Sequence, residues 1–437
     1  MTRRASTRAL LRRRGWLGAL GSLSLGALAG GPVASSLLGC SALSSALPAL
    51  WFSYGGKNRE ALLALVKAFG EEQPEHRLRA VYQGDYFELL AKLRTAMHAG
   101  AVPAVTHVIA EVMPYLAEAG VLEPLDELEG LSGDLELVPE LAQEGAFTPK
   151  PGRRLYGLPF NRSTPIAYLN GAVLDELGLA PPTTWEELER FAALATKGEG
   201  SDRRFGFACP IDWWFWVALV GQAGGELVDA EGRYVLGAEA GERALALWQR
   251  LVHEQGVMRP PPGRDYNAWQ VTNLDFLAGR AAMIWTSTAF LRYLEENAKF
   301  RVVAAPLPRD VRHAVPTGGT MFVVPRAATS EEKRHAAAFL RFMVLPERAN
   351  EFATKTGYIP VSRAGIAELE RSGWYASHAN DAVARDQLRH VRPWPWSPEL
   401  FRVQREVVQP RLEEAVLERR PPREVLASAR HAIEEGM

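Results

Sequence analysis

The stretch from residue 50 to residue 119 alternates between two hydrophobic periods, and this alternation narrows the possible folds more than any other feature of the chain. Apolar runs and period-two segments indicate strands, whereas apolar residues three or four positions apart indicate amphipathic helices. Strands are predicted over 50–54, 76–82 and 102–109, and helices over 58–69, 85–98 and 113–119, with Asn58 and Asp85 as N-caps. Strands that alternate with helices are typical of crossover units, so we expect an α/β fold with a largely parallel sheet in each part.

The same alternation continues to the C-terminus, and the chain of 437 residues is too long for one hydrophobic core. Further strands are predicted over 203–210, 281–285, 301–306 and 320–325, and further helices over 184–195, 212–224, 239–255, 330–344 and 423–435. Thr184 and Glu187 form the pattern of a capping box at the start of one of these helices. An extended stretch over 155–169 is expected to cross between two lobes. We predict lobe one over 48–157 and 317–358, and lobe two over 159–304 and 360–437, which together form a hinged clamp.

The first forty residues have the composition of an export signal. They carry six arginines and no acidic residue, and an uncharged stretch over 15–39 precedes Cys40. Leu37-Leu38-Gly39-Cys40 resembles a bacterial lipobox, so residues 1–39 are predicted to be removed, Cys40 to carry lipid and 40–47 to act as a tether. Arg13-Arg14-Gly15-Trp16-Leu17 resembles a twin-arginine signal, and the general secretory route is the alternative. A single uncleaved membrane helix remains a further alternative. The predicted location is the extracytoplasmic face of the cell envelope, in the periplasm.

Composition excludes several other classes of protein. The formal net charge of −1 does not suit a nucleic-acid-binding protein. The nine histidines are scattered, and neither HExxH nor CxxC occurs, so we expect no metal and no cofactor. With Cys40 lipidated, Cys209 would have no disulfide partner, and its apolar surroundings predict a small buried side chain.

Several short motifs carry a family resemblance over nearly the whole predicted mature chain. The most specific are Tyr82-Gln83-Gly84-Asp85-Tyr86, Pro159-Phe160-Asn161-Arg162-Ser163-Thr164-Pro165 and Thr356-Gly357-Tyr358-Ile359-Pro360. Weaker ones are Thr184-Trp185 and Gly318-Gly319. With these motifs the chain resembles the extracellular solute-binding proteins of bacterial ABC importers, and among them the receptors for sn-glycerol-3-phosphate. The resemblance implies a two-lobed periplasmic-binding-protein-like fold of type II and a monomer that works with ABC permease and ATPase subunits.

The resemblance also implies a set of ligand contacts. Those that match the family are Tyr86, Glu111, Ser163, Ser287, Gly319, Tyr358 and Arg405. Arg402 is an alternative to Arg405 for the same contact. One extra residue just before Glu111 leaves open whether Glu111 aligns with the acidic contact of the family. Arg162 stands where the family has a small polar residue, and either adds a second cation or faces solvent. Thr288 and Trp214 are further candidates, the latter as a stacking surface or as helical core.

The chemistry of these residue types suits a phosphate ester. Hydroxyl groups and N–H groups where a strand enters a helix favour an anion, which applies to Ser287 and Thr288. An arginine makes a bidentate contact with a phosphate, which applies to Arg405. Glu111 suits the glycerol end of the ligand, where its carboxylate would accept from hydroxyl groups.

The leading hypothesis is a lipid-anchored receptor that captures sn-glycerol-3-phosphate or a glycerophosphodiester and delivers it unaltered to an importer. One alternative is an oligosaccharide receptor of a sugar importer. Another is a secreted phosphodiester or glycoside hydrolase, although the sequence has neither a GxSxG motif nor a P-loop. A structural lipoprotein is the remaining alternative.

Overall fold

The computed structural model describes residues 47–131, 133–147 and 154–436 of the chain. The predicted export signal, Cys40 and most of the tether lie outside these residues. Within the described part of the chain, no helix is both long enough and apolar enough to span a membrane.

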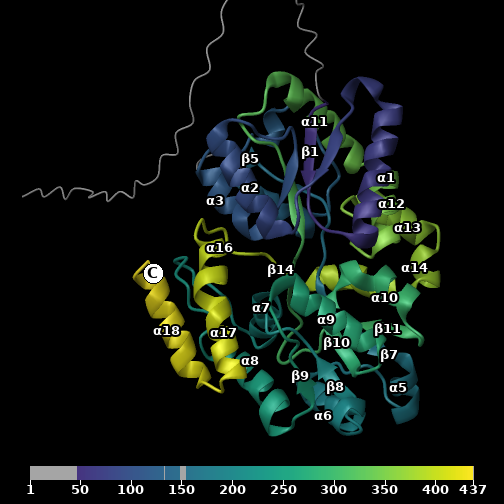
Figure 1. Ribbon diagram of the computed structural model, residues 1–437, viewed down its shortest axis with the longest axis vertical. Helices are drawn as coiled ribbons and strands as arrows, with labels where there is room; N and C mark the ends of the chain where they lie inside the picture. Colours follow the sequence, from purple (N-terminus) through teal and green to yellow (C-terminus); the bar gives the residue numbers. More distant parts are fainter. Residues whose placement is uncertain (1–46, 132, 148–153, 437) are drawn as a thin grey trace, which may run out of the picture. The chain divides into compact units, whose positions relative to one another are not determined.

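The first lobe is built on strands that follow the predicted strand–helix order (Figure 1). Its elements are β1 (Ala49–Phe52), α1 (Gly56–Glu72), β2 (Arg79–Tyr82), α2 (Tyr86–Ala99), β3 (Thr106–Ile109) and α3 (Met113–Glu118). Strands β1 and β2 are parallel, and a parallel bridge between Leu50 and Val105 brings the segment before β3 beside β1. Two strands from later in the chain, β6 (Leu158–Pro159) and β13 (Thr320–Val323), complete this lobe.

The second lobe contains a five-stranded sheet in the order β11-β7-β10-β8-β9. Its strands are β7 (Pro165–Asn170), β8 (Phe205–Ala208), β9 (Met258–Arg259), β10 (Ala281–Ser287) and β11 (Val302–Ala305). Every residue of β7 and of β10 is buried, which fits their central positions between neighbouring strands and helices.

Most strands of each lobe run in the same direction, which confirms the predicted mostly parallel sheets, and one strand in each lobe is reversed. β13 pairs antiparallel with both β3 and β6, and β7 pairs antiparallel with both β10 and β11. The neighbouring parallel strands β1 and β2 are joined by helix α1, because two adjacent parallel strands need a crossover connection. β13 instead enters the first sheet from a distant part of the chain, and the hydrophobic pattern of a strand does not record its direction.

Helices cover the sheets and fill the C-terminal part of the chain. Those from the middle of the chain are α4 (Pro139–Ala142), α5 (Gly171–Leu177), α6 (Trp185–Ala195), α7 (Trp213–Gln222), α8 (Glu239–Gln249), α9 (Asp265–Leu277) and α10 (Leu291–Asn297). The later ones are α11 (Ser330–Met343), α12 (Pro346–Thr356), α13 (Arg363–Arg371), α14 (Trp374–Ser377), α15 (Ala379–Gln387), α16 (Leu400–Arg402), α17 (Gln409–Leu417) and α18 (Pro422–Glu434). There are also short strands, β4 (Ala146–Phe147), β5 (Arg154–Leu155), β12 (Val315–Pro316) and β14 (Val391–Arg392), and π-helical turns over Arg250–Glu254 and Val403–Val408. Short 3₁₀ turns lie between several of these elements. In Figure 1, α17 and α18 lie side by side near α8, and contacts join all three helices.

The hydrophobic cores follow the two sheets. One core holds Leu50 and Phe322 of the first lobe, and the largest core holds Trp248 and Trp285 of the second. Ala384 and Leu388 belong to the first of these cores, although α15 also packs on β11 of the second sheet. The segment after residue 360 therefore shares its packing between the lobes, and the residue boundaries predicted for each lobe stay a prediction.

Helix starts test the local predictions directly. Asp85 forms a complete capping box with Glu88 at the start of α2, which confirms it as the N-cap. Thr184 caps α6 through the N–H group of Glu187, but the carboxylate of Glu187 accepts from Thr183 instead of Thr184, so the reciprocal half of the predicted box is shifted by one residue. Asn58 does not cap α1, because that helix already begins at Gly56.

Candidate ligand-binding site

Asn161 organises a group of polar side chains at the edge of the first sheet. Its side chain is fully buried, and its carbonyl oxygen accepts from the N–H group of Thr320 at 2.9 Å and from the Thr320 hydroxyl. Its amide nitrogen then donates to two phenol oxygens, that of Tyr86 at 3.0 Å and that of Tyr358 at 3.1 Å. Two predicted ligand residues that are far apart in sequence are thereby brought together.

Both phenols are positioned by local structure. Tyr86 is the first residue of α2, directly after the N-cap Asp85, and Tyr358 follows Gly357, which ends α12 in a left-handed conformation with φ of 108°. Burial raises the pKa of Tyr86 and raises the pKa of Tyr358 still further, so both groups stay protonated at physiological pH. Each phenol therefore keeps an O–H group that can donate a hydrogen bond to a ligand.

Arg405 reaches this group from the second lobe. The centre of its guanidinium lies 4.0 Å from the centroid of the Phe87 ring, and Phe87 is the neighbour of Tyr86 on α2. Both terminal nitrogens of Arg405 donate to Asp265, with 3.0 Å between Nη2 and Oδ2. Its competitor Arg402 forms an ion pair with Glu399 at 3.3 Å. Arg405 therefore lies against the residue that follows Tyr86, and its guanidinium is held by a carboxylate of the protein.

Asp265 is held in an unusual backbone conformation. It is the first residue of α9, and its φ is +53°, a left-handed value that aspartate adopts more readily than most residues. Such strained positions cluster at functional sites. Because Arg405 pairs with Asp265 and also lies over Phe87, the N-terminus of α9 lies near the N-terminus of α2 in the first lobe.

Two carboxyl groups with raised pKa values, the buried Glu111 and the half-buried Asp212, lie in the same region. Burial raises the pKa of Glu111 from 4.5 to about 7, the charge of Glu144 adds to this effect, and Arg162 opposes it. Burial likewise raises the pKa of Asp212, the N-cap of α7, from 3.8 to about 6. Perturbed carboxyl groups of this kind are typical of functional sites, although buried structural networks also produce them.

Arg162 does not face solvent, and only one of its three nitrogens has a hydrogen-bond partner among the described residues, since Nε and Nη1 are buried without one. Its side chain has no exposed surface, and its Nη2 atom donates to Glu144 and, at 2.6 Å, to the hydroxyl of Thr317. Glu144 also accepts from Thr317 at 2.6 Å and from the N–H group of Trp394 at 3.3 Å. The alternative that Arg162 points into solvent is therefore wrong. Arg162 joins Glu144, which precedes the first predicted crossing between the lobes near residue 158, to Thr317, which lies at the next predicted crossing.

The Gly318-Gly319 motif packs closely against the Asn161–Ser163 segment. The N–H group of Gly318 donates to the carbonyl of Ser163 at 2.7 Å, and the bond in the reverse direction measures 3.2 Å. A methyl group on Gly319, whose φ is +87°, would lie 1.8 Å from the carbonyl oxygen of Asn161. Both features require a residue without a side chain at this position. The Ser163 side chain is almost fully buried at this junction.

Ser287 ends β10 and Thr288 follows it, and the N–H groups of Thr288 and Ala289 already have partners. The hydroxyl of Ser287 accepts from the N–H group of Ala289, and the N–H group of Thr288 donates to the carbonyl of Thr164. A short 3₁₀ turn over 288–290 precedes α10, so no long helix starts here. The Thr288 hydroxyl is buried and has no hydrogen-bond partner among the described residues.

A row of aromatic rings adjoins these residues. The Trp214 indole donates to the carbonyl of Thr317 at 2.9 Å, and its ring lies 5.2 Å from that of Trp269. Trp269 in turn lies 6.4 Å from Phe290, which lies 6.5 Å from Tyr266. Trp214 is 6 % exposed, so it is mainly part of the core, whereas Trp269 is half-buried and Tyr266 is exposed.

Several members of this group were missed in the sequence. Asn161 lies inside a quoted motif but has no predicted role, because an amide shows its partners only in the folded chain. Asp212 could have been noticed in the sequence, because it is an acidic residue at the start of a predicted aromatic helix. Asp265 and Tyr266 have none, since nothing nearby in the sequence points to Arg405 or Tyr86.

Two further observations bear on chemistry. Among residues 47–131, 133–147 and 154–436, no group of three or more histidine, cysteine, aspartate or glutamate side chains is arranged to hold a metal ion. Cys209 is fully buried and forms no disulfide, and burial raises the pKa of its thiol. The predicted small buried side chain is confirmed.

Comparisons with known proteins agree on one class. Residues 64–381 match the family described as bacterial extracellular solute-binding protein. The sn-glycerol-3-phosphate-binding periplasmic protein UgpB of Yersinia pseudotuberculosis is 25% identical over 363 residues, which cover 79% of this chain and 81% of that protein. The protein of the same name from Pectobacterium atrosepticum is 24% identical over 430 residues, covering 92% and 93% of the two chains.

Solved structures show the same fold. UgpB from Mycobacterium tuberculosis in complex with glycerophosphocholine aligns with a TM-score of 0.77 and 24% identity, covering 90% of this chain and 98% of that one. The GacH receptor of Streptomyces glaucescens, solved unliganded and with acarbose, has the same TM-score of 0.77, with 19% identity and coverage of 89% and 98%. These similarities confirm the predicted two-lobed fold of type II, and the family match covers well over half of the chain. The chain belongs to the bacterial extracellular solute-binding protein family.

Proposed function

We propose that this protein is the substrate-binding subunit of an ABC importer, and that it captures a glycerophosphodiester or sn-glycerol-3-phosphate and passes it unaltered to a permease. The names of the relatives support this ligand class. The observation that carries the proposal is the approach of Arg405 to Phe87, the residue after Tyr86 on α2, in the lobe where Asn161 holds the phenols of Tyr86 and Tyr358 together. A cation and several O–H donors are what the oxygen atoms of a phosphate group require.

The charge balance of the site favours the diester over the monoester. Arg405 is paired with Asp265 and Arg162 with Glu144, so each cation is already neutralised by a carboxylate. The remaining acids, Glu111 and the nearby Asp212, add negative charge as the pH rises past their pKa values. Such surroundings oppose a phosphate dianion. They suit a phosphodiester, which carries one negative charge and, with a choline head group, a compensating positive one.

In this proposal each residue acts on a particular part of the ligand. Tyr86, Tyr358 and Arg405 donate to the phosphate oxygens, with Ser163, Ser287 and the N–H group of Gly319 as further donors. Glu111 accepts from the glycerol hydroxyls. The half-buried Trp269, which packs on Trp214, offers an aromatic face to a quaternary ammonium group. Thr288 contributes its buried hydroxyl, which has no hydrogen-bond partner in the part of the chain that the structure describes.

Isothermal titration of the full chain with glycerophosphocholine, sn-glycerol-3-phosphate and maltotriose tests the ligand class. We expect saturable binding of glycerophosphocholine at micromolar or tighter Kd, about −8 kcal/mol, and weaker binding of the monoester. Arg405→Ala should weaken binding of the phosphodiester at least tenfold. An unchanged affinity in that variant would remove Arg405 from the site.

An oligosaccharide is the second candidate ligand. Its support is the aromatic row of Trp214, Trp269, Phe290 and Tyr266 and the oligosaccharide-type ligands of structural neighbours, acarbose for GacH and maltotriose for the binding protein of Thermus thermophilus. Binding of maltotriose but not of glycerophosphocholine would select it.

The remaining parts of the proposal concern turnover and anchoring. We propose that the protein is not an enzyme, that Cys40 is lipidated after export and that the protein acts as a monomer whose lobes span about 48–157 with 317–358, and 159–304 with 360–437. Mass spectrometry of glycerophosphocholine after incubation should return the intact compound. Cys40→Ala should release the protein from membranes into the soluble periplasmic fraction.

A further inference from the structure

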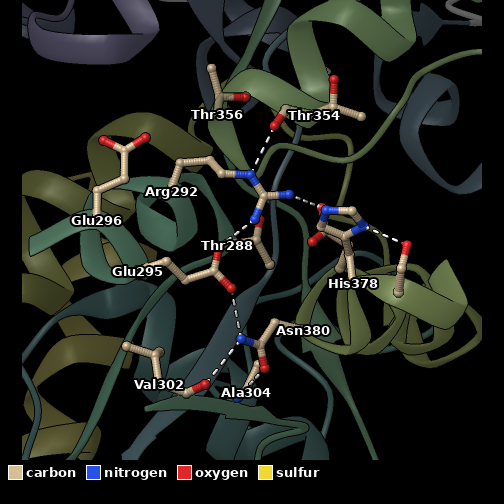
Figure 2. Close-up of polar contacts among 12 residues, drawn as sticks. Thr288, Arg292, Glu295, Glu296, Val302, Ala304, Thr354, Thr356, His378 and Asn380 are labelled. Atoms are coloured by element: carbon tan, nitrogen blue, oxygen red, sulfur yellow. Dashed lines mark hydrogen bonds and ion pairs between the residues drawn. The ribbon is translucent and has the colours of Figure 1, made fainter. Parts of the chain in front are cut away.

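Arg292 on α10 is the centre of a polar network in the second lobe. Its side chain is 12 % exposed and uses all three nitrogens: Nε donates to the carbonyl of Thr354 at 2.8 Å, Nη1 to Glu295 at 2.5 Å and Nη2 to Asp381 at 2.5 Å. Figure 2 shows the guanidinium between Thr354 and Glu295. Each nitrogen of Arg292 therefore donates to an oxygen atom of the protein itself.

Asn380 fixes the same network to the second sheet. Its amide nitrogen donates to Glu295 at 2.8 Å and to the carbonyl of Val302 at 3.1 Å, and its oxygen accepts from the N–H group of Ala304 at 2.8 Å (Figure 2). Val302 and Ala304 belong to β11, the edge strand of the five-stranded sheet. Glu295 and Arg292 are thus tied to a rigid element rather than to a surface loop.

Thr354 belongs to the other lobe. It lies in the last turn of α12, whose residues Ala349 and Phe352 are part of the core that holds Leu50 and Phe322. The carbonyl groups at the C-terminus of a helix lack partners within the helix, and a cation there is favoured. The N–H group of Tyr358, four residues further on, donates instead to the hydroxyl of Thr356 at 3.2 Å. Arg292 therefore supplies the hydrogen bond that the helix itself does not give to Thr354.

A second contact at the same place is close enough to exclude a side chain. A methyl group on Gly357 would lie 2.5 Å from the carbonyl oxygen of Thr288 and 2.7 Å from the Cβ of Leu291. Gly357 directly precedes Tyr358, and Thr288 directly follows Ser287. The segments that carry these two proposed ligand contacts therefore lie against each other at Gly357 and Thr288. Arg292 is four residues after Thr288, and it binds the carbonyl of Thr354, three residues before Gly357.

We propose that Arg292 is a positioning residue, which locks the C-terminus of α12 onto α10 and so holds Tyr358 of one lobe at a fixed distance from Ser287 of the other. The inference rests on the proposed function, because it takes Tyr358 and Ser287 as ligand contacts. The contact between α10 and α12 fixes the two lobes to each other next to residues 358–360, where the chain crosses between them. A ligand then meets Tyr358 and Ser287 already held in place as donors. Fixing donors in advance lowers the cost of binding.

A double-mutant cycle tests the inference in the full-length protein. Arg292→Lys keeps the positive charge for Asp381 and Glu295, but it has a single nitrogen and cannot also reach the carbonyl of Thr354. We expect Arg292→Lys and Tyr358→Phe each to weaken glycerophosphocholine binding by about tenfold, measured by titration calorimetry. The double variant should be no more than about twofold weaker than Tyr358→Phe alone, because Arg292 acts through Tyr358.

Lys57→Met is the matched control. Lys57 of α1 forms an ion pair with Glu296 of α10 at 2.5 Å, so it also joins the lobes at α10, but its side chain is 41 % exposed. Removing this exposed pair should leave the Kd within twofold of the wild type. A tenfold loss in Lys57→Met would mean that any contact between α10 and the first lobe matters, and would overturn the specific role of Arg292.

Hydrogen exchange reads the same segment without a ligand. The amide of Gly357 donates to the carbonyl of Ala353 at 2.8 Å. Its hydrogen-exchange rate should be higher in Arg292→Lys than in the wild type, and the same in Lys57→Met as in the wild type. Equal exchange in Arg292→Lys, or fully additive losses of affinity in the cycle, would overturn this inference alone. An unchanged affinity in Tyr358→Phe would instead overturn the proposed site, and the inference with it.

Discussion

Glu111→Gln tests the electrostatics of the site in one substitution. Glu111 follows β3 in a short 3₁₀ turn, is 8 % exposed, and shares its surroundings with Glu144, Arg162 and Asp212. Glutamine keeps the shape of the side chain and the capacity to accept from a hydroxyl group, but it never carries charge. The variant therefore removes one ionisation and little else.

The magnitude follows from the raised pKa. The pKa of Glu111 in the folded protein is about 7 against an ordinary value of 4.5, and a tenfold difference in proton affinity is about 1.4 kcal/mol, so the difference is worth about 3 kcal/mol. Between these two values the unfolded chain has lost the proton and the folded chain retains it. The contribution of Glu111 to the free energy of unfolding therefore falls as the pH rises from 4.5 to 7, and is constant above 7.

Urea unfolding from pH 4 to pH 8 measures this contribution as a difference between proteins. The free energy of unfolding of Glu111→Gln, relative to the wild type, should rise by about 3 kcal/mol across this range, with the change centred between pH 4.5 and 7. Glu118→Gln, an exposed glutamate on α3, is the control and should show no such trend. A difference that stays flat with pH for Glu111→Gln would refute the buried, largely protonated carboxyl group.

Three further substitutions probe the contacts around the phenols. Asp265→Asn removes the acid that holds Arg405, so the affinity for sn-glycerol-3-phosphate should rise relative to that for glycerophosphocholine. Competition titrations measure the ratio of the two affinities, and an unchanged ratio would show that Asp265 does not compete with phosphate for Arg405. Asn161→Ala removes the amide shared by the two phenols and should lower the free energy of unfolding by about 1–3 kcal/mol as well as weaken binding, whereas loss of binding with full stability would show that Asn161 has no structural role. Gly319→Ala places a methyl group against the carbonyl of Asn161 and should cost about 1–3 kcal/mol in chemical unfolding, so a stability equal to that of the wild type would rule out the close approach.

Local features of the fold could be predicted from the sequence. The N-caps of α2 and α6 were correct because Asp85 and Thr184 act on N–H groups two or three residues away. Helices α7 and α11 lie within about two residues of their predicted ranges for the same reason. Asn58 was the wrong cap, since Gly56 and Lys57 extend α1 toward its N-terminus and leave Asn58 inside the helix.

Strand direction and side-chain partners depend on contacts between distant segments. The hydrophobic pattern of β13 predicts a strand, but its antiparallel pairing with β3 depends on how the chain returns from the second lobe. Likewise, an arginine at position 162 shows no sign in the sequence that Glu144 will neutralise it. The predicted site residues Tyr86 and Tyr358 were found through a resemblance, whereas the amide that joins them was visible only in the folded chain.

The central claim is that the full-length protein binds a glycerophosphodiester between Arg405 of one lobe and the phenols of Tyr86 and Tyr358 of the other. Its most direct test is a crystal structure after soaking with glycerophosphocholine. The account predicts phosphate oxygens within hydrogen-bond distance of both phenols and of the Arg405 guanidinium, with the intact ligand in the density. A phosphate bound elsewhere, or a site that stays unoccupied at millimolar ligand while maltotriose enters it, would contradict the account.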